Sequence, residues 1–228
     1  LLESAIAAAR RTNTRLVFPA NVWIYGPDGS GRPVDESRAP LPTSQRGKLR
    51  ADMERSIRDA GIRYALVRLP EFYGPSVVTL TAQVFRAALT GRLALWPGPL
   101  DVTIELIYMP DAARGLVEIA TAVGGDAAVF HLPGARTTPR RFIESVYASA
   151  GETPRAFGVP RWILAAGGMF NSTLNGVADF SHLWTHPVLL DGAKYTAKFG
   201  PVPVTPLAEA IPATLAWHRA NPSLRLAH

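Results

Sequence analysis

The chain has 228 residues, of which 47% are hydrophobic and 18% are charged, and it contains no cysteine. This length and apolar content allow a substantial core, and they exclude an intrinsically disordered, collagen-like or coiled-coil chain. Without cysteine the protein has no disulfides, no thiolate nucleophile and no Cys-ligated zinc or iron–sulfur cluster. This composition fits a reducing compartment, so we expect a cytoplasmic protein.

The net charge of +6 arises from 24 Lys and Arg against 18 Asp and Glu, and nearly all of the basic residues are arginine. Such a charge attracts anionic small molecules such as nucleotides. A nucleic-acid binder would gather its basic residues on one face with aromatic residues between them, whereas here they are scattered along the chain. No apolar run approaches the roughly 20 residues of a membrane span. We therefore expect a small-molecule substrate as partner, and neither nucleic acid nor membrane.

The first part of the chain alternates helices and strands. Residues 2–11 are rich in alanine, with apolar positions three and four apart, which predicts a helix, and 15–25 form an apolar run typical of a buried strand. After a polar loop, a helix is predicted over 44–60, ended by Gly61, and a second apolar strand over 63–69. This alternation predicts an α/β fold with a parallel sheet covered by helices.

The later segments are less regular. Thr138 is a predicted helix N-cap with Pro139 at the first helical position, and Pro212 is expected to interrupt or kink the last helix. The predicted elements in chain order are a helix at 77–91, a strand at 104–109, a helix at 111–122, a strand at 128–132, a helix ending at Ala150, mostly helix over 160–186, and a final helix at 206–220.

Two short motifs suggest ligand binding, but each has an ordinary alternative. The loop from Gly26 to Gly31 follows a strand, yet it lacks the spacing G-x-G-x-x-G and does not lead into a helix, so we interpret it as a surface turn. His182 and His186 are four residues apart, which would place both imidazoles on one helical face. Because no third ligand is evident nearby, we interpret them as surface or pocket histidines and expect no metal site.

The predicted helix over 44–60 has two stripes with a four-residue period. The stripe that we expect to face the core consists of Leu49, Met53 and Ile57. The neighbouring stripe consists of Arg46, Arg50 and Glu54. Two arginines one turn apart repel each other unless an anion neutralises them, and Glu54 can pair with Arg50, which leaves Arg46 open. Two readings stay open, a solvated charged face and an anion site that grips phosphate.

Four segments follow one another in a specific order: FPANVWIYG at 18–26, RGKLRADME at 46–54, RLPEFYGP at 68–75 and IYMPDAAR at 107–114. Together with the closing helix, this order resembles the extended short-chain dehydrogenase/reductases that form the NAD-dependent epimerase/dehydratase family, which includes nucleotide-sugar epimerases. In that family a strand ends in Ser-x-x-x-Tyr-Gly, and the next helix carries Tyr-x-x-x-Lys-x-x-x-Glu.

The resemblance implies a doubly wound parallel, Rossmann-like sheet and a smaller, mixed substrate-binding region. It assigns 1–76, with 104–135 returning, to the later half of an NAD(P)-binding domain, and 77–103 and 136–228 to the substrate-binding region. Family members begin with a strand, a glycine-rich loop and a second strand. None of these is present before Leu1, so we expect an N-terminally truncated Rossmann domain with an incomplete pyrophosphate site, and NAD or NADP as the cofactor.

The resemblance also places the catalytic serine, tyrosine and lysine positions of the family at Asn21, Arg46 and Arg50. An arginine stays protonated over the whole pH range in which proteins function, so Arg46 cannot act as the proton shuttle that tyrosine provides. Arg50 still donates hydrogen bonds and can hold a ribose. Tyr25, Glu71 or another group would have to replace the lost acid/base.

Ligands of doubly wound sheets bind at the carboxyl ends of the strands. The residues expected to bind the cofactor there are Pro19, Ala20, Arg50, Leu69 and Pro70. Those expected to face the substrate are Asn21, Tyr25, Arg46 and Glu71. The implied activity is that of an NAD(P)-dependent oxidoreductase acting on a nucleotide sugar or a related hydroxyl or carbonyl compound. The alternative is a catalytically silent NAD(P)-binding sensor or regulatory protein, and family members often form homodimers through the helix that holds Arg46.

Overall fold

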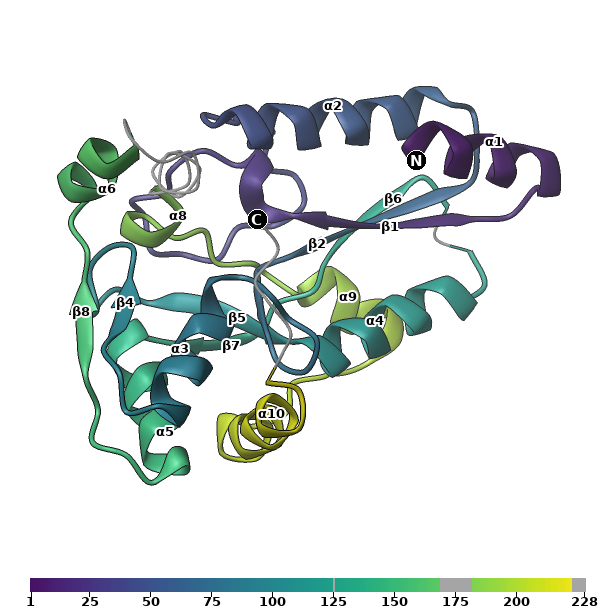
Figure 1. The fold of residues 1–228 in the computed structure, drawn as a ribbon. Helices are drawn as coiled ribbons and strands as arrows, with labels where there is room; N and C mark the ends of the chain where they lie inside the picture. Colours follow the sequence, from purple (N-terminus) through teal and green to yellow (C-terminus); the bar gives the residue numbers. More distant parts are fainter. Residues whose placement is uncertain (125, 169–181, 223–228) are drawn as a thin grey trace.

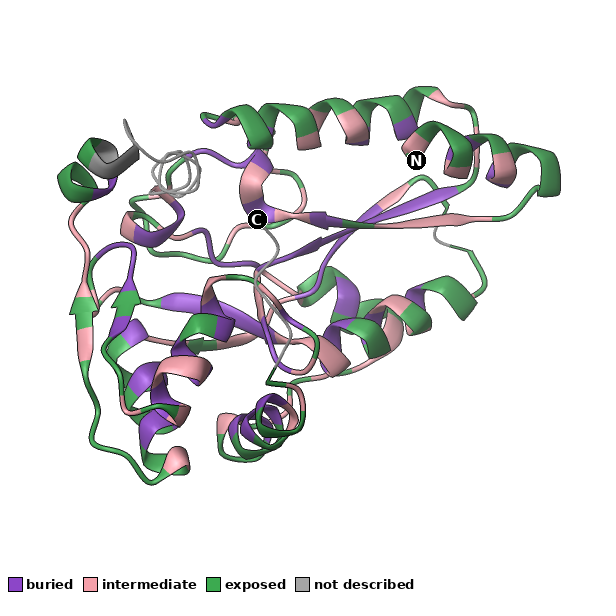
Figure 2. Cartoon of the chain, viewed as in Figure 1, coloured by how far each residue is buried: buried purple, intermediate pink, exposed green. Residues whose placement is uncertain are grey.

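The computed structural model describes residues 1–124, 126–168 and 182–222. One part of it is a parallel sheet in the strand order β1-β2-β6 (Figure 1). Its strands are β1 (Leu16–Asn21), β2 (Tyr64–Leu69) and β6 (Ala128–His131). All six residues of the central strand β2 are buried, as Figure 2 shows along its length. An apolar run buried on both faces is typical of such a strand.

Helices cover both faces of this sheet (Figure 1). One face packs against α1 (Leu2–Thr12) and α2 (Gln45–Asp59), and the other packs against α4 (Met109–Thr121) and α9 (Ala193–Phe199). Because side chains alternate along a strand, Leu66 joins the core under α1 and α2, whereas Ala65 and Val67 join the opposite core. The arrangement is the three-layered α/β architecture that the sequence predicts.

A second part of the molecule is mixed. Strand β3 (Glu71–Tyr73) runs parallel to β5 (Ile104–Tyr108), and β7 (Ala135–Thr137) pairs with β5 antiparallel. Separately, β4 (Ala94–Trp96) pairs in parallel with β8 (Ala156–Gly158). The helices that complete this part are α3 (Leu80–Leu89), α5 (Pro139–Ala150), α6 (Arg161–Gly168), α8 (His182–Thr185) and α10 (Leu207–Ala220).

The local signals at helix ends are confirmed. The hydroxyl of Ser44 accepts the N–H of Gly47 at 3.0 Å and caps α2, and Thr138 caps α5 by accepting the N–H of Arg141 at 3.2 Å. Gly61 follows α2 with φ +64°, a conformation that glycine adopts without a steric penalty. These ends could be predicted because they depend on residues within one turn of the chain.

Other predictions were wrong in detail. The strand expected over 15–25 ends at Asn21, because the Asn21 side chain accepts the N–H of Trp23 at 3.1 Å and starts a 3₁₀ turn, η1 (Val22–Ile24). The helix expected over 160–186 is described as α6 and α8, and residues 169–181 lie outside the described part. The sequence did not predict α9 or the short strands β3, β4, β7 and β8, which are too brief to show a periodic pattern.

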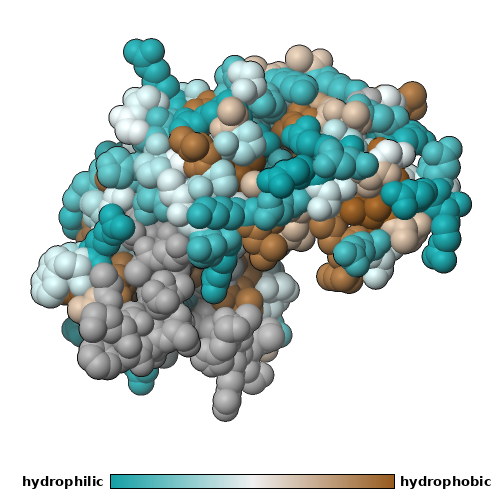
Figure 3. All heavy atoms as spheres, turned by 90° about the horizontal axis from the view of Figure 1, so that it is seen from above, coloured by the Kyte–Doolittle hydropathy of each residue, from teal (hydrophilic) through white to brown (hydrophobic). Residues whose placement is uncertain are grey.

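The core stripe predicted on α2 was also wrong in part. Ile57 is buried, but Leu49 is 59% exposed, whereas Glu54 is only 3% exposed. The helix is rotated in this way because the carboxylate of Glu54 points into the sheet. The outer face formed by α1 and α2 is mostly hydrophilic, with hydrophobic residues between the polar ones (Figure 3). No helix among the described residues is long and apolar enough to cross a bilayer.

A buried ion pair joins α2 to β2. Arg68 is 2% exposed, and its guanidinium contacts the Glu54 carboxylate through Nη2–Oε2 at 2.9 Å and Nε–Oε1 at 3.3 Å. The predicted pairing of Glu54 with Arg50 was therefore wrong. The second basic residue near Glu54 is Arg58, at 3.7 Å. A two-point contact of this kind fixes both the distance and the rotation of the helix relative to the strand.

We expect Arg68→Met to lower the free energy of unfolding by about 3–5 kcal/mol, because it leaves the buried Glu54 carboxylate without its main partner. Urea denaturation would measure the change. The matched control is Arg55→Met, which removes the partner of Asp52 in an exposed pair and should change stability by no more than about 1 kcal/mol. Equal effects of the two substitutions would contradict this account of the ion pair.

Candidate functional site

The carboxyl ends of β1 and β2 lie side by side, with Asn21 opposite Leu69 in the register. The 3₁₀ turn η1 follows β1 directly, and Pro70 alone separates β2 from β3, which begins at Glu71. The first turns of α2 pack against η1, since a Cβ on Gly47 would lie 2.3 Å from the carbonyl oxygen of Trp23. The glycine therefore allows a close approach that brings the start of α2 to this edge of the sheet.

The two arginines of α2 lie at the same edge but differ in exposure. Arg46 is exposed, whereas Arg50 is half-buried, with its guanidinium carbon 5.7 Å from the centre of the Trp23 ring. A cation over an indole face is stabilised by the ring quadrupole. This contact fixes Arg50 beside the ends of the strands.

The other predicted site residues are spread over surface and core. Ala20, Leu69 and Pro70 are buried, Pro19 is exposed and Asn21 is half-buried with its side-chain oxygen engaged by Trp23. The structure thus brings the ends of β1 and β2 together as predicted, while the side chains of Pro19 and Arg46 face outward.

A hollow lies between η1 and the start of β3, and we refer to it as the carboxyl-edge hollow. It has about 380 Å³ of empty space, part of it open to solvent, and about 30 Å³ of this can hold the centre of a water molecule. Its lining consists of Val22, Trp23, Pro70, Glu71, Ile104, Glu105, Leu183, Trp184, Pro187 and Val188. Pro70 and Glu71 are the two predicted site residues that line it.

Two glutamates, Glu71 and Glu105, line this hollow, and the pKa of each is raised. Burial raises the pKa of Glu71 to about 7, against a hydrogen bond from Thr79 that lowers it. Burial likewise raises the pKa of Glu105 to about 7, although its carboxylate accepts the N–H of Leu190 at 3.0 Å and the Nε–H of Arg136 at 3.1 Å. Near neutral pH each carboxyl group can therefore either give up or take up a proton.

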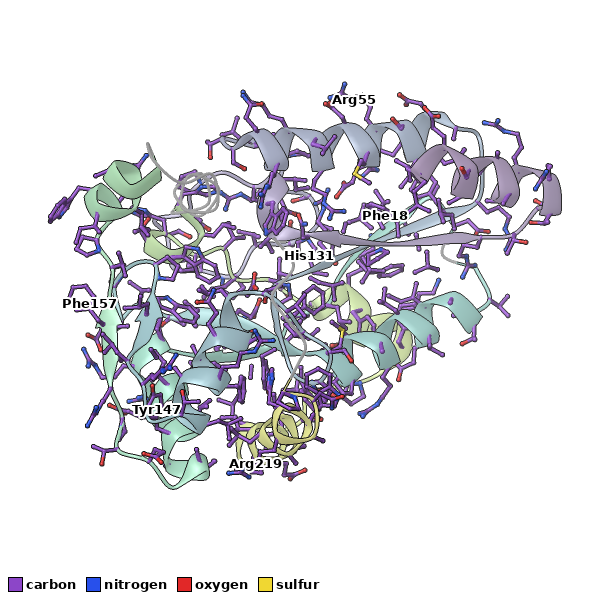
Figure 4. All side chains as sticks on the ribbon, viewed as in Figure 1. Phe18, Arg55, His131, Tyr147, Phe157 and Arg219 are labelled. Carbon is purple, nitrogen blue, oxygen red and sulfur yellow. The ribbon has the colours of Figure 1, made fainter. Side chains whose placement is uncertain are left out.

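Tyr25 is completely buried and belongs to a chain of hydrogen bonds in the centre of the molecule. Arg68 donates to its hydroxyl, and the hydroxyl is 2.8 Å from Nε2 of His131, the residue labelled at the centre of Figure 4. Nδ1 of His131 lies 3.0 Å from the carbonyl oxygen of Val34. Since a carbonyl can only accept, Nδ1 carries the hydrogen and Nε2 accepts the tyrosine O–H. The phenol is fully engaged there, away from the carboxyl-edge hollow.

His131 is neutral near pH 7. Burial, and secondarily the positive charge of Arg68, lower its pKa to about 4. The backbone N–H of the same residue donates to Glu36 at 2.8 Å, so that β6 is joined to the loop between η1 and α2. Burial also raises the pKa of Tyr25. Neither group is suited to proton transfer near neutral pH, and we interpret both as structural.

The remaining motifs have a plain outcome. Gly29 and Gly31 are exposed, and a Cβ added at either would meet no atom within 4 Å, as expected for the predicted surface turn. Nδ1 of His186 lies 3.1 Å from the Thr185 hydroxyl. The described residues include no group of three His, Asp or Glu side chains that could hold a metal ion.

Sequence reasoning missed Glu105, Trp23 and Trp184 as parts of the site. The signal for Glu105 was present, because a single carboxylate within the apolar strand IELIY has to be buried or paired. The two tryptophans had no such signal, since they come from segments about 160 positions apart that meet only in the folded chain.

The fold defines the class of the protein, an α/β chain whose parallel strands end side by side at one edge of the sheet, where doubly wound folds in general bind ligands. The sequence profile of the NAD dependent epimerase/dehydratase family matches residues 2–145. The chain therefore belongs to that family. No curated protein matches the chain.

Solved structures share the fold. The Bordetella bronchiseptica enzyme WbmH, in complex with NAD⁺, has a TM-score of 0.73 and 20% identity, with 95% of this chain and 66% of that chain covered. The dTDP-glucose 4,6-dehydratase of Bacillus anthracis, in complex with NAD, has a TM-score of 0.79 and 14% identity, with 98% and 68% covered. The UDP-glucose 4-epimerase of Thermus thermophilus, also with NAD, has a TM-score of 0.72 and 19% identity, with 95% and 68% covered. This chain spans about two thirds of their length.

The buried neutral His131 should make stability fall in acid. Between pH 6.5 and 4 the unfolded chain binds a proton at this histidine and the folded chain does not, so the free energy of unfolding decreases as pH falls through this window. The loss should approach about 3 kcal/mol by pH 4. Glu71 and Glu105 have pKa values of about 7 and also change the stability in this pH range. The measurement is therefore the difference in free energy of unfolding between the natural chain and His131→Gln. This difference should shrink from pH 7 to pH 4. A constant difference would mean that His131 is not held neutral.

Proposed function

We propose that this chain is part of an NAD(P)-dependent oxidoreductase that acts on a nucleotide sugar or a related hydroxyl or carbonyl compound. Family membership and the NAD-bound solved relatives support the class of reaction. The observation that carries the proposal is the position of Glu71, a half-buried residue whose carboxyl group has a pKa of about 7, at the carboxyl edge, next to positions where the family holds its catalytic groups.

The residues at this edge fit the nicotinamide end of NAD(P). Arg50 supplies fixed hydrogen-bond donors for a ribose, Leu69 and Pro70 supply apolar surface, and Ala20 has no bulky side chain to block close approach. When bound, the cofactor supplies the hydride chemistry of the family. Among the described residues, the glycine turn at 26–31 does not meet a helix N-terminus, so we assign to this chain the nicotinamide end rather than the pyrophosphate.

We assign proton transfer to Glu71. In the direction of oxidation its carboxylate accepts the proton of the substrate hydroxyl, and in the direction of reduction its carboxyl group returns that proton. Arg46 cannot do this because a guanidinium does not release a proton in this pH range, and it is assigned an anionic part of the substrate. Asn21 is assigned to substrate as well. In this scheme 1–76 with 104–135 form the cofactor side and 77–103 with 136–228 the substrate side.

We expect Glu71→Gln to lower kcat by about 10²-fold or more, with a smaller change in KM, because the amide keeps the shape of the carboxyl group but transfers no proton. For alcohol oxidation, the kcat of the natural protein should rise with pH through about 7, where Glu71 loses its proton, and this inflection should be absent in the variant. Glu3→Gln, on the exposed face of α1, is the matched control. An unchanged pH profile in Glu71→Gln would remove this residue from the mechanism.

Cofactor binding is tested separately. NADH and NADPH are titrated into the protein as expressed from its own gene, with the quenching of tryptophan fluorescence as the readout. We expect binding of at least one of the two, weakened about tenfold in Arg50→Ala by loss of charged hydrogen bonds. If neither cofactor binds, the oxidoreductase proposal fails.

A second candidate is a cofactor-binding sensor without turnover. It is favoured by the arginines at the positions of the family's tyrosine and lysine, one of which is exposed. Cofactor binding together with no substrate-dependent change in nicotinamide absorbance would support this alternative. A change that is lost in Glu71→Gln would reject it.

A further inference from the structure

The walls of the carboxyl-edge hollow are apolar apart from the two glutamates. Trp23 and Val22 come from η1, and Trp184 and Leu183 come from α8, about 160 positions later in the chain. The lining residues that the structure describes include no lysine, arginine or histidine. This composition is informative because a buried charged ligand needs an opposite charge or several hydrogen bonds.

The aromatic walls are held in place. Trp184 is 8% exposed and packs edge-on against the completely buried Trp96, with ring centres 5.1 Å apart. Trp23 is fixed at its backbone by Asn21 and Gly47 and at its ring by the Arg50 guanidinium. Large rigid aromatic surfaces bind rings at low entropic cost.

The cation that contacts Glu105 is already paired. The Arg136 guanidinium contacts the Glu105 carboxylate at 3.1 Å and donates to the carbonyl of Leu190 at 2.9 Å. Glu105 itself also accepts the N–H of Leu190, so its acceptors are engaged on the side of the loop that follows α8. Glu71 has Thr79 as its hydrogen-bonding partner from the protein. It is therefore the lining group best placed to meet a ligand.

We infer that the carboxyl-edge hollow binds the uncharged, reacting part of the substrate, a flat apolar ring with a hydroxyl or carbonyl group directed at Glu71, rather than the diphosphate end of a nucleotide sugar. This inference rests on the proposed function and names its substrate class. Among the described lining residues, a phosphate placed here would meet two carboxyl groups and no basic side chain. A ring with one polar substituent would cover the tryptophans and satisfy the glutamate.

The test compares three probes by calorimetry: 1-tetralone, which is uncharged, 1-naphthoate, which has a similar ring system but is an anion, and UDP-glucose. We expect 1-tetralone to bind at least tenfold more tightly than either of the others. Trp23→Ala should weaken that binding about tenfold, whereas Trp162→Ala, at a 72% exposed tryptophan on α6, should leave it unchanged. Glu71→Gln should narrow the difference between the ketone and the anion, because the repelling carboxylate is gone.

Tight binding of UDP-glucose that Trp23→Ala weakens would overturn the inference, and so would a failure of 1-tetralone to bind or an equal effect of the two tryptophan substitutions. Because the measurement needs no turnover, it is independent of the cofactor test. Ketone binding without NADH or NADPH binding would refute the oxidoreductase and leave the ligand class standing. Cofactor binding with a nucleotide sugar in the hollow would refute the ligand class and leave the oxidoreductase standing. Circular dichroism of each variant separates lost binding from lost folding.

Discussion

The buried contact between Glu54 and Arg68 determines how the candidate site is assembled. It fixes α2 on β2, and through the Tyr25 hydroxyl it also fixes the segment that follows β1. An ion pair removed from water contributes little net stability compared with an apolar pair of the same shape, but it tolerates only one geometry. The start of α2, η1 and the ends of the two strands therefore keep a constant arrangement around the carboxyl-edge hollow.

The substitutions at the family's catalytic positions have a physical meaning in this arrangement. A phenol and an amine near a nicotinamide form a proton-transfer pair, whereas two guanidinium groups do not titrate. The structure offers proton-transfer capacity elsewhere, at carboxyl groups that burial has made weakly acidic. Chemistry based on Glu71 and Glu105 would operate from β3 and β5 instead of from α2.

Much of the fold could be predicted from the sequence because its signals are local. The N-cap at Thr138, the glycine after α2 at Gly61 and the apolar run of β2 depend on neighbouring residues, and they gave correct elements. The orientation of α2 could not be predicted in this way. The burial of Glu54 depends on Arg68, which lies fourteen positions further along in another element, and a period-four pattern cannot distinguish a charged residue facing water from one facing a buried partner. For the site, the family order located the carboxyl edge and Glu71, but its walls come from segments far apart in the chain.

Pro19 has a consequence for the border of the sheet. The N–H of Leu16 donates to the carbonyl of Arg63 beside β2, so alternation along β1 turns the nitrogen of Pro19 toward the opposite side. A proline nitrogen carries no hydrogen, and the flank of β1 that faces away from β2 therefore lacks one backbone hydrogen-bond donor in its middle. Any strand that pairs along this flank therefore lacks one hydrogen-bond donor at Pro19, which restricts the register in which it can pair with β1.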